Sequence, residues 1–315
     1  MTPLRAGFSL LLAATSAMAA VDPGLLNLVM PDAQVVSGVQ VTQTLASPFG
    51  QYILSQMQPG DAAFQQFLAA TGFDPRKDLQ QVVAATGDTT SNPQDALVVG
   101  RGAFQLSQIN TAATSLGAVV TQYRGVNIYT SPDSKSQTSV AFPDASTALI
   151  GNVAAVQAAI DRSLANAVFT GPLAALAQTI SATNQAWFAT TSPLSDFAGG
   201  KLGGANLGSV NSANLLQSVL QATGGVAFTA TGLTLACNAV TASPQNAQAL
   251  IDVLKFVLSM IQSNANDPKV TSIASGATFT VNGSTAQISV PVSEQQVEQL
   301  FMPNAARARR MPLAK

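Results

Sequence analysis

Short strand-like runs that meet at tight turns alternate with amphipathic helical patterns along this chain, and this alternation restricts the fold class most. Asn282-Gly283 stands between apolar runs at 279–281 and 286–292, and Asn-Gly in such a place is the strongest short signal for a β-hairpin. Arg124-Gly125 separates two further runs in the same way. Hairpins joined by amphipathic helices predict an α+β fold, in which antiparallel sheets carry helices on one face.

The local patterns place the individual elements. We expect strands at 33–41, 96–100, 119–123, 126–130, 139–142, 148–150, 186–190, 226–231, 233–240, 279–281 and 286–292. We expect helices at 48–57, 62–70, 74–86, 104–116, 172–181, 215–224 and 243–263, and after the N-cap residues Asn152 and Ser293. Ser293 and Gln296 have the spacing of a capping box.

An internal similarity suggests that the chain contains two related halves. Residues 78–87 match residues 215–224 at six of ten positions, and both segments predict a helix that ends at glycine. A strand followed by a capped helix closes each half. We therefore expect a duplication, with a first α+β unit at 20–168 and a second at 169–302.

Residues 1–19 have the layout of a secretory signal peptide. Arg5 supplies the positive start, an apolar run follows, and Ala17-Met18-Ala19 provides a small-residue cleavage site. We expect cleavage after Ala19 and a periplasmic or secreted protein. The last segment, 303–315, contains four basic and no acidic residues, and we expect a disordered tail there.

The charge and cysteine content limit the partners of the chain. Charged residues make up 9% of the sequence, and residues 20–302 hold 9 basic and 15 acidic side chains, a balance of −6. An acidic body does not attract nucleic acid, because that binding depends on Lys and Arg at the phosphates. The only cysteine, Cys237, lies far from the cleavage site, so we expect neither a disulfide nor the lipid anchor of a bacterial lipoprotein. We expect no transmembrane segment in the mature chain.

Most familiar catalytic and metal sites are missing from the sequence. The chain has no histidine, which removes the usual base of a serine triad and a preferred zinc ligand. Asn264, Asn266 and Asp267 offer one carboxylate, too few for a typical calcium site. We therefore predict no catalytic, cofactor-binding or metal-binding residues.

Paired carboxylates and glycine-rich segments are the remaining candidates for chemistry. Asp74 with Asp78, and Glu294 with Glu298, each lie four residues apart at an expected helix start, where the helix dipole already favours negative charge. Gly100-Arg101-Gly102 and the segment 199–208 resemble phosphate loops but lack required residues of those motifs. We interpret all of them as structural. For the segment 199–208, a mobile lid over a pocket is the alternative interpretation.

The segment Gly72-Phe73-Asp74-Pro75-Arg76-Lys77-Asp78-Leu79 resembles a pattern of exported bacterial proteins of unknown function. Those proteins pair a "GxDPxxD" helix with a long helix and a closing hairpin, as expected here for 243–292. The resemblance covers most of the mature chain in layout. It implies a duplicated α+β arrangement and brings no catalytic residue with it.

Together these observations predict an exported soluble protein with a non-enzymatic binding or interaction role in the cell envelope. Its partner would be an unknown protein or envelope component, without a cofactor. Two alternatives stay open. One is a hydrolase that uses two carboxylates on envelope or extracellular carbohydrate. The other is a carrier that holds an apolar ligand between sheet and helices.

Overall fold

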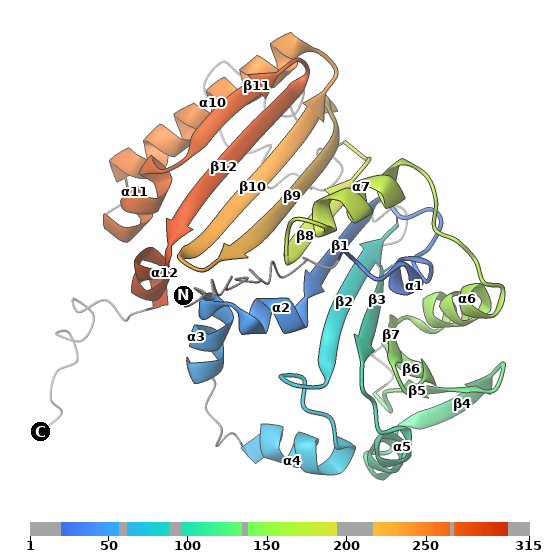
Figure 1. Ribbon diagram of the computed structural model, residues 1–315. Coiled ribbons are helices and arrows are strands. Elements are labelled where there is room, and N and C mark those ends of the chain that lie inside the picture. The colour runs from blue at the N-terminus through green and yellow to red at the C-terminus, as the bar shows by residue number, and fades with distance from the viewer. Residues whose placement is uncertain are drawn as a thin grey trace, which may run out of the picture.

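A single antiparallel sheet of twelve strands organises the computed structural model (Figure 1). The structure describes residues 20–56, 62–87, 96–133, 138–193, 217–264 and 268–301. The strand order is β11-β12-β10-β9-β8-β1-β2-β3-β7-β6-β5-β4, and all neighbouring strands pair antiparallel. Together with ten helices in the described residues, this confirms the predicted α+β class.

The strands are β1 (Val35–Gln40), β2 (Leu79–Thr86), β3 (Ala96–Gly102), β4 (Val119–Tyr123), β5 (Val126–Thr130), β6 (Ser139–Asp144), β7 (Thr147–Gly151), β8 (Ala186–Thr190), β9 (Val219–Thr229), β10 (Gly232–Thr241), β11 (Thr278–Asn282) and β12 (Thr285–Ser293). The helices are α1 (Pro23–Leu26), α2 (Val41–Ala46), α3 (Pro48–Gln56), α4 (Ala62–Thr71), α5 (Leu106–Ser115), α6 (Val153–Leu164), α7 (Pro172–Ser181), α10 (Pro244–Asn264), α11 (Pro268–Ser275) and α12 (Glu294–Phe301).

Turn and cap chemistry explains why most elements form where the sequence predicts them. Gly283 has a φ of 55° in the β11–β12 hairpin, a conformation that glycine adopts without strain. The Asn152 side chain accepts a hydrogen bond from the Ala155 N–H at the start of α6. Ser293 and Gln296 form the predicted capping box, with N···O distances of 2.9 and 3.3 Å.

The helices predicted at 74–86 and 215–224 are wrong. The structure places β2 and the first half of β9 there, while residues 215 and 216 lie outside the described chain. Along β2, Val83 and Ala85 are fully buried on one face and Leu79 and Val82 lie on the other. A strand covered on both faces is apolar almost throughout, so its periodicity resembles that of a buried helix.

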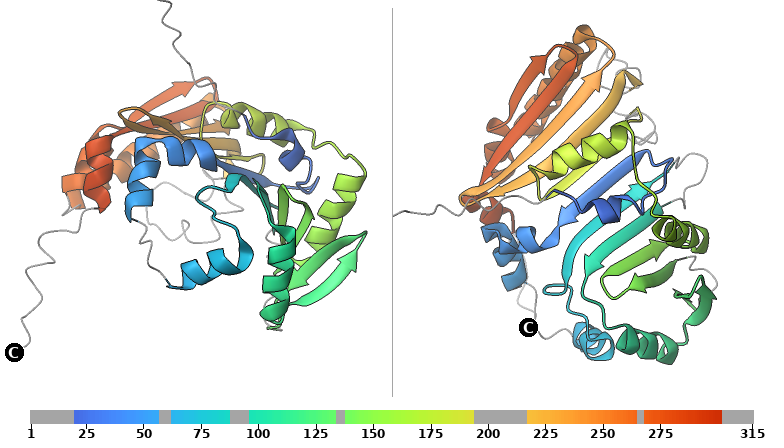
Figure 2. Two further views of the ribbon diagram at one scale, coloured as in Figure 1. Left: turned by 60° about the horizontal axis from the view of Figure 1, so that its bottom comes forward. Right: turned by 45° about the vertical axis from the view of Figure 1, so that its right-hand side comes forward.

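Helices cover both faces of the sheet, in contrast to the predicted single face. Val99 of β3 belongs to the main core, which contains residues of α1, α6 and α7. Its neighbour Val98 faces α4 and α5 instead, because successive strand residues point to opposite sides. Figure 2 shows the sheet arched, with α4 and α5 beneath the arch. This second layer positions the candidate site.

The strand order is symmetric about the central β8–β1 pair. Outward from β1 the sheet continues β2-β3-β7-β6, and outward from β8 it continues β9-β10-β12-β11; only the first half adds the hairpin β5-β4. The predicted duplication stays a prediction, because the two matched segments are not helices and Leu216 lies outside the described residues. The unit boundary between residues 168 and 169 also stays a prediction. Strands from both sides of this boundary belong to the same sheet.

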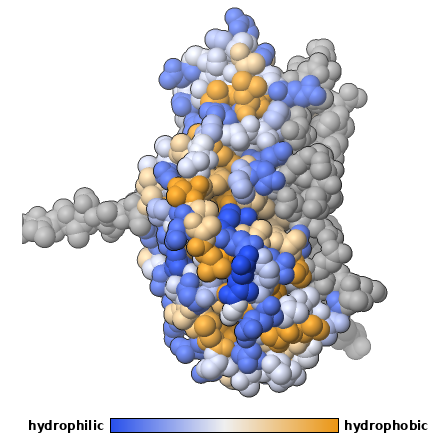
Figure 3. All heavy atoms as spheres, turned by 90° about the vertical axis from the view of Figure 1, so that its right-hand side faces the viewer, coloured by the Kyte–Doolittle hydropathy of each residue, from blue (hydrophilic) through white to orange (hydrophobic). Residues whose placement is uncertain are grey.

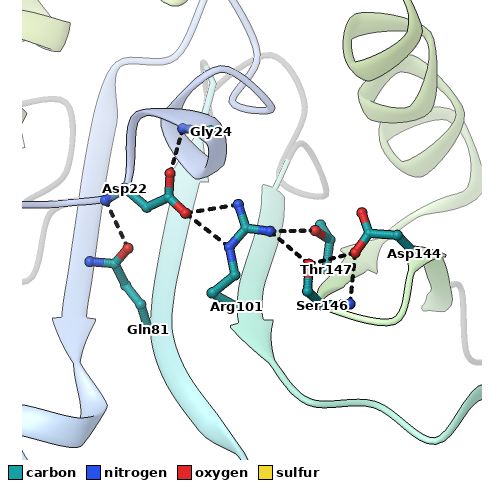
Figure 4. A network of polar contacts seen from close by, with 7 residues as sticks. All are labelled: Asp22, Gly24, Gln81, Arg101, Asp144, Ser146 and Thr147. Carbon is teal, nitrogen blue, oxygen red and sulfur yellow. Dashed lines mark hydrogen bonds and ion pairs between the residues drawn. The ribbon is translucent and has the colours of Figure 1, made fainter.

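A polar network fixes the start of the described chain to the sheet (Figure 4). Arg101 of β3 forms an ion pair with Asp22 at 2.8 Å and donates to the Thr147 hydroxyl at 2.8 Å. The Asp22 N–H donates to Gln81 at 2.9 Å. Val21, only 1% exposed, donates its N–H to the Ser181 hydroxyl. Just after the predicted cleavage site, Val21 therefore belongs to the core, and Asp22 is bonded to the sheet.

Two strand glycines differ in how much room they have, and this predicts different responses to substitution. A Cβ on Gly38 would lie 2.6 Å from the Trp187 ring, whereas a Cβ on Gly100 would meet no atom closer than 3.7 Å. We expect Gly38→Ala to lower the free energy of unfolding by about 1–3 kcal/mol through overpacking. Gly100→Ala, the matched control, should leave it unchanged or raise it by up to ~1 kcal/mol. Urea unfolding measures both; equal losses would contradict the packing around Gly38.

Candidate binding cavity

An apolar cavity of about 520 Å³ lies between the sheet and the helices beneath its arch. Its size is within the range of roughly 300–1,000 Å³ typical of ligand sites, and it far exceeds the water-sized voids of packed interiors. The sheet forms one side of the cavity, which we call the floor: Leu79, Val82, Val98, Gly100, Tyr129, Val140, Phe142, Ala148 and Ile150. The helices and their connections contribute the rest: Phe67, Thr71, Phe73, Phe104, Ile109, Ala112, Ala113 and Leu116.

Small side chains in the middle of the floor create the depth of the cavity. Gly100 of β3 pairs with Val82 of β2 on one side and with Ala148 of β7 on the other. The opposite side, which we call the roof, contains Ala112 and Ala113 of α5. Larger residues at these positions would bring the helix and sheet into contact and fill the space.

A row of aromatic rings forms one wall of the cavity. Phe73 packs on Phe104, and Phe104 on Phe142, with ring centroids 5.1 Å apart in both pairs. Phe67 of α4 meets the edge of Phe73 at 6.4 Å, and Tyr129 meets Phe142 at the same distance. The row thus joins α4 to β6 and β5 through apolar contacts alone.

The cavity lining carries no charged side chain among the described residues. Its two hydroxyls already have partners within the protein: Thr71 donates to the Phe67 carbonyl at 2.7 Å, and Tyr129 donates to the Asn110 side chain at 3.2 Å. A buried charge without a partner is costly. The lining therefore suits an aliphatic or aromatic group. It provides no polar partner that could replace the water bound to a charged group.

The connection from α4 to β2 contains the first pair of candidate carboxylates. Arg76 donates two hydrogen bonds to the Asp74 carboxylate, at 2.9 and 2.8 Å, and Asp78 accepts the Asp74 N–H at 2.7 Å. The hydrogen bond from Arg76 holds the pKa of Asp74 below its usual 3.8, against the opposing effect of desolvation. Both carboxylates thus stabilise this turn, in line with a structural role, although the turn does not begin a helix.

Among the other candidates from the sequence that the structure describes, only Gly100 lines the cavity. Glu294 and Glu298 border a small depression of about 20 Å³ between α3 and α12. Gly100, Arg101 and Gly102 lie within β3 and pair with β2 and β7, so they form no phosphate loop. The segment 199–208 and residues Asn266 and Asp267 are outside the described chain. No cluster of three metal-ligating residues occurs within the described ranges.

Cys237, the single cysteine, is a structural thiol in β10. It pairs with Gly224 and Ile288 in the ladder, and burial raises the pKa of its thiol above the usual 9.0. A thiol with a raised pKa forms little thiolate at neutral pH and is a poor nucleophile.

The outer surface contrasts with the cavity. Figure 3 shows hydrophobic residues in several separate patches, with hydrophilic residues between them, on the side of the molecule that it presents. Leu116 is 79% exposed while also lining the cavity, so it marks where the cavity meets solvent. None of the described helices has the length and hydropathy needed to cross a bilayer.

Comparison with known proteins supports the fold. No protein-family model matches the chain, and no curated protein matches it. Crystal forms I and III of TP0453 are similar in structure, with TM-scores of 0.51 and 0.55, and each is 15% identical in sequence. Both alignments cover 90% of this chain and 98% of the TP0453 chain. At this identity the likeness extends to the fold alone.

The turn beside the cavity should respond to acid. Because the folded pKa of Asp74 is depressed, its contribution to stability is present above the unfolded value of about 3.8 and is lost as the pH falls through the folded value. We expect Asp74→Asn to lower the free energy of unfolding at neutral pH, and this difference to shrink as the solution becomes more acidic than pH 3.8. Urea unfolding at several pH values measures it. A difference independent of pH would contradict the ion pair with Arg76.

Proposed function

We propose that this protein binds an apolar ligand in the cavity beneath the sheet and carries it without catalysing a reaction. The observation that supports this most is a cavity of about 520 Å³ whose lining is almost wholly apolar. Binding would be driven by removal of ligand surface from water, which contributes about 25 cal/mol per Å² of apolar area. This is the carrier alternative drawn from the sequence, and it gives the expected binding role a definite site.

The carboxylate hydrolase has less support. A glycosidase needs two carboxyl groups facing each other across its substrate, roughly 5–10 Å apart. No carboxylate belongs to the described lining of the cavity, and Asp74 is already engaged by Arg76. An apolar lining also offers a sugar few hydrogen-bond partners.

We further propose that the chain is exported and acts in the cell envelope or outside the cell. The signal-like segment 1–19 and the burial of Val21 just after it support this. An exported carrier would hold an apolar compound in an aqueous compartment where it is poorly soluble. The partner that supplies or receives the ligand would be an envelope component.

Filling the cavity from its roof should weaken ligand binding while leaving the fold intact. Ala113 lines the cavity and Thr114, the next residue of α5, is exposed. We expect Ala113→Phe to weaken the binding of a fluorescent fatty acid about tenfold or more, given overpacking costs of about 1–3 kcal/mol. Thr114→Phe adds the same ring outside and should bind like the unaltered protein. Equal binding by all three proteins would disprove the proposed site.

Export can be tested independently of binding. We expect protein recovered from the periplasm or medium of expressing bacteria to begin at Ala20, because cleavage after Ala19 leaves Val21 and Asp22 free to dock. N-terminal sequencing of each cell fraction measures this, and deletion of residues 2–19 provides the control. Full-length chain found only in the cytoplasm would contradict the proposal.

A further inference from the structure

We infer that the cavity selects its ligand by the length of one unbranched aliphatic chain, and that Gly100 and Ala148 determine the accepted length. This inference rests on the proposed function and specifies the ligand class of the same site. We also infer that the protein does not recognise the polar head of the ligand.

The shape of the cavity favours a long, narrow ligand. Its floor crosses five consecutive strands, in the order β2-β3-β7-β6-β5. Neighbouring strands lie about 4.8 Å apart, so four spacings give a length of about 19 Å. A volume of about 520 Å³ spread over that length leaves a narrow cross-section. The ligand therefore lies across the strands, beneath α5.

Gly100 and Ala148 occupy the point where this path is easiest to block. They pair with each other on β3 and β7, the second and third of the five strands. Ala112 and Ala113 lie on the roof. A Cβ on Gly100 would lie 3.7 Å from Leu79 and 3.8 Å from Ala148, both ordinary contacts. A larger side chain there would enter the cavity without forcing the backbone to move.

The polar head of the ligand has no partner inside. The lining holds no described charged residue, and the hydroxyls of Thr71 and Tyr129 are hydrogen-bonded within the protein. Leu116, largely exposed at the C-terminal end of α5, indicates an opening through which the head can stay in water. A free fatty acid and a lipid with the same chain would then be recognised alike.

The test measures affinity for octanoate, laurate, palmitate and stearate by calorimetry, using delipidated protein that spans residues 20–315. For the unaltered protein we expect affinity to rise by about fourfold per methylene, the equivalent of about 0.8 kcal/mol, until the cavity is full. Gly100→Leu should weaken palmitate binding at least tenfold and leave octanoate binding unchanged. Thr114→Leu, which adds the same side chain outside the cavity, should match the unaltered protein.

The outcomes separate this inference from the proposed function. If the unaltered protein binds none of these acids, both fail. If it binds long chains but Gly100→Leu weakens all lengths equally, or none, only the inferred role of Gly100 and Ala148 fails. Thermal unfolding checks that the variant is folded, and Ala148→Val provides a second, smaller obstruction at the paired position.

A second comparison tests the head. Palmitate, cetyl alcohol and palmitoyl lysophosphatidylcholine carry chains of the same length on a charged, a neutral and a bulky zwitterionic head. We expect affinities within a few-fold of one another and little dependence on salt. A preference of more than tenfold for palmitate would place a cationic partner at the site and overturn selection by the chain alone.

Discussion

The two-sided burial of the central strands is the constraint on which the rest of the structure depends. On β3, Val99 packs into the main core, while Val98 and Gly100 face the cavity. Since alternate residues of a strand must face opposite ways, one strand serves two apolar layers of different character. The layer covered by α6 and α7 contains the main buried core, and the layer covered by α4 and α5 encloses the cavity.

The sequence predicted local structure well where a turn or cap determines it. The Asn282-Gly283 hairpin, the Asn152 cap and the Ser293 capping box all form, because each depends on chemistry within a few residues. It failed at β2 and β9, where the faces of a strand are defined by helices far away in sequence. Val82 and Val83 are chemically alike, and nothing local says that one faces a cavity and the other a core.

The candidate site was predictable only as a class. An apolar carrier was one of the alternatives consistent with a chain that lacks histidine and has few charges, yet no lining residue could be singled out. In the sequence, Gly100 resembled part of a phosphate loop. In the structure, the absence of a side chain at Gly100 leaves space that belongs to the cavity. That space depends on residues of β7 and α5 that come together around Gly100 only in the folded chain, and it leaves no motif in the sequence.

The central β1–β8 pairing also affects how the chain can fold. Val21 and Ser181, which are joined by a hydrogen bond beside this pairing, lie 160 residues apart in the sequence, and β1 pairs with β8 along five residues. Pairing between such distant segments slows folding, because closing the long stretch of chain between them costs entropy before their contacts can form. Until residue 190 emerges from the ribosome, β1 lacks one of its two neighbours. A chain with this topology stays incompletely folded for most of its synthesis, and it reaches its final form only once its second half is present.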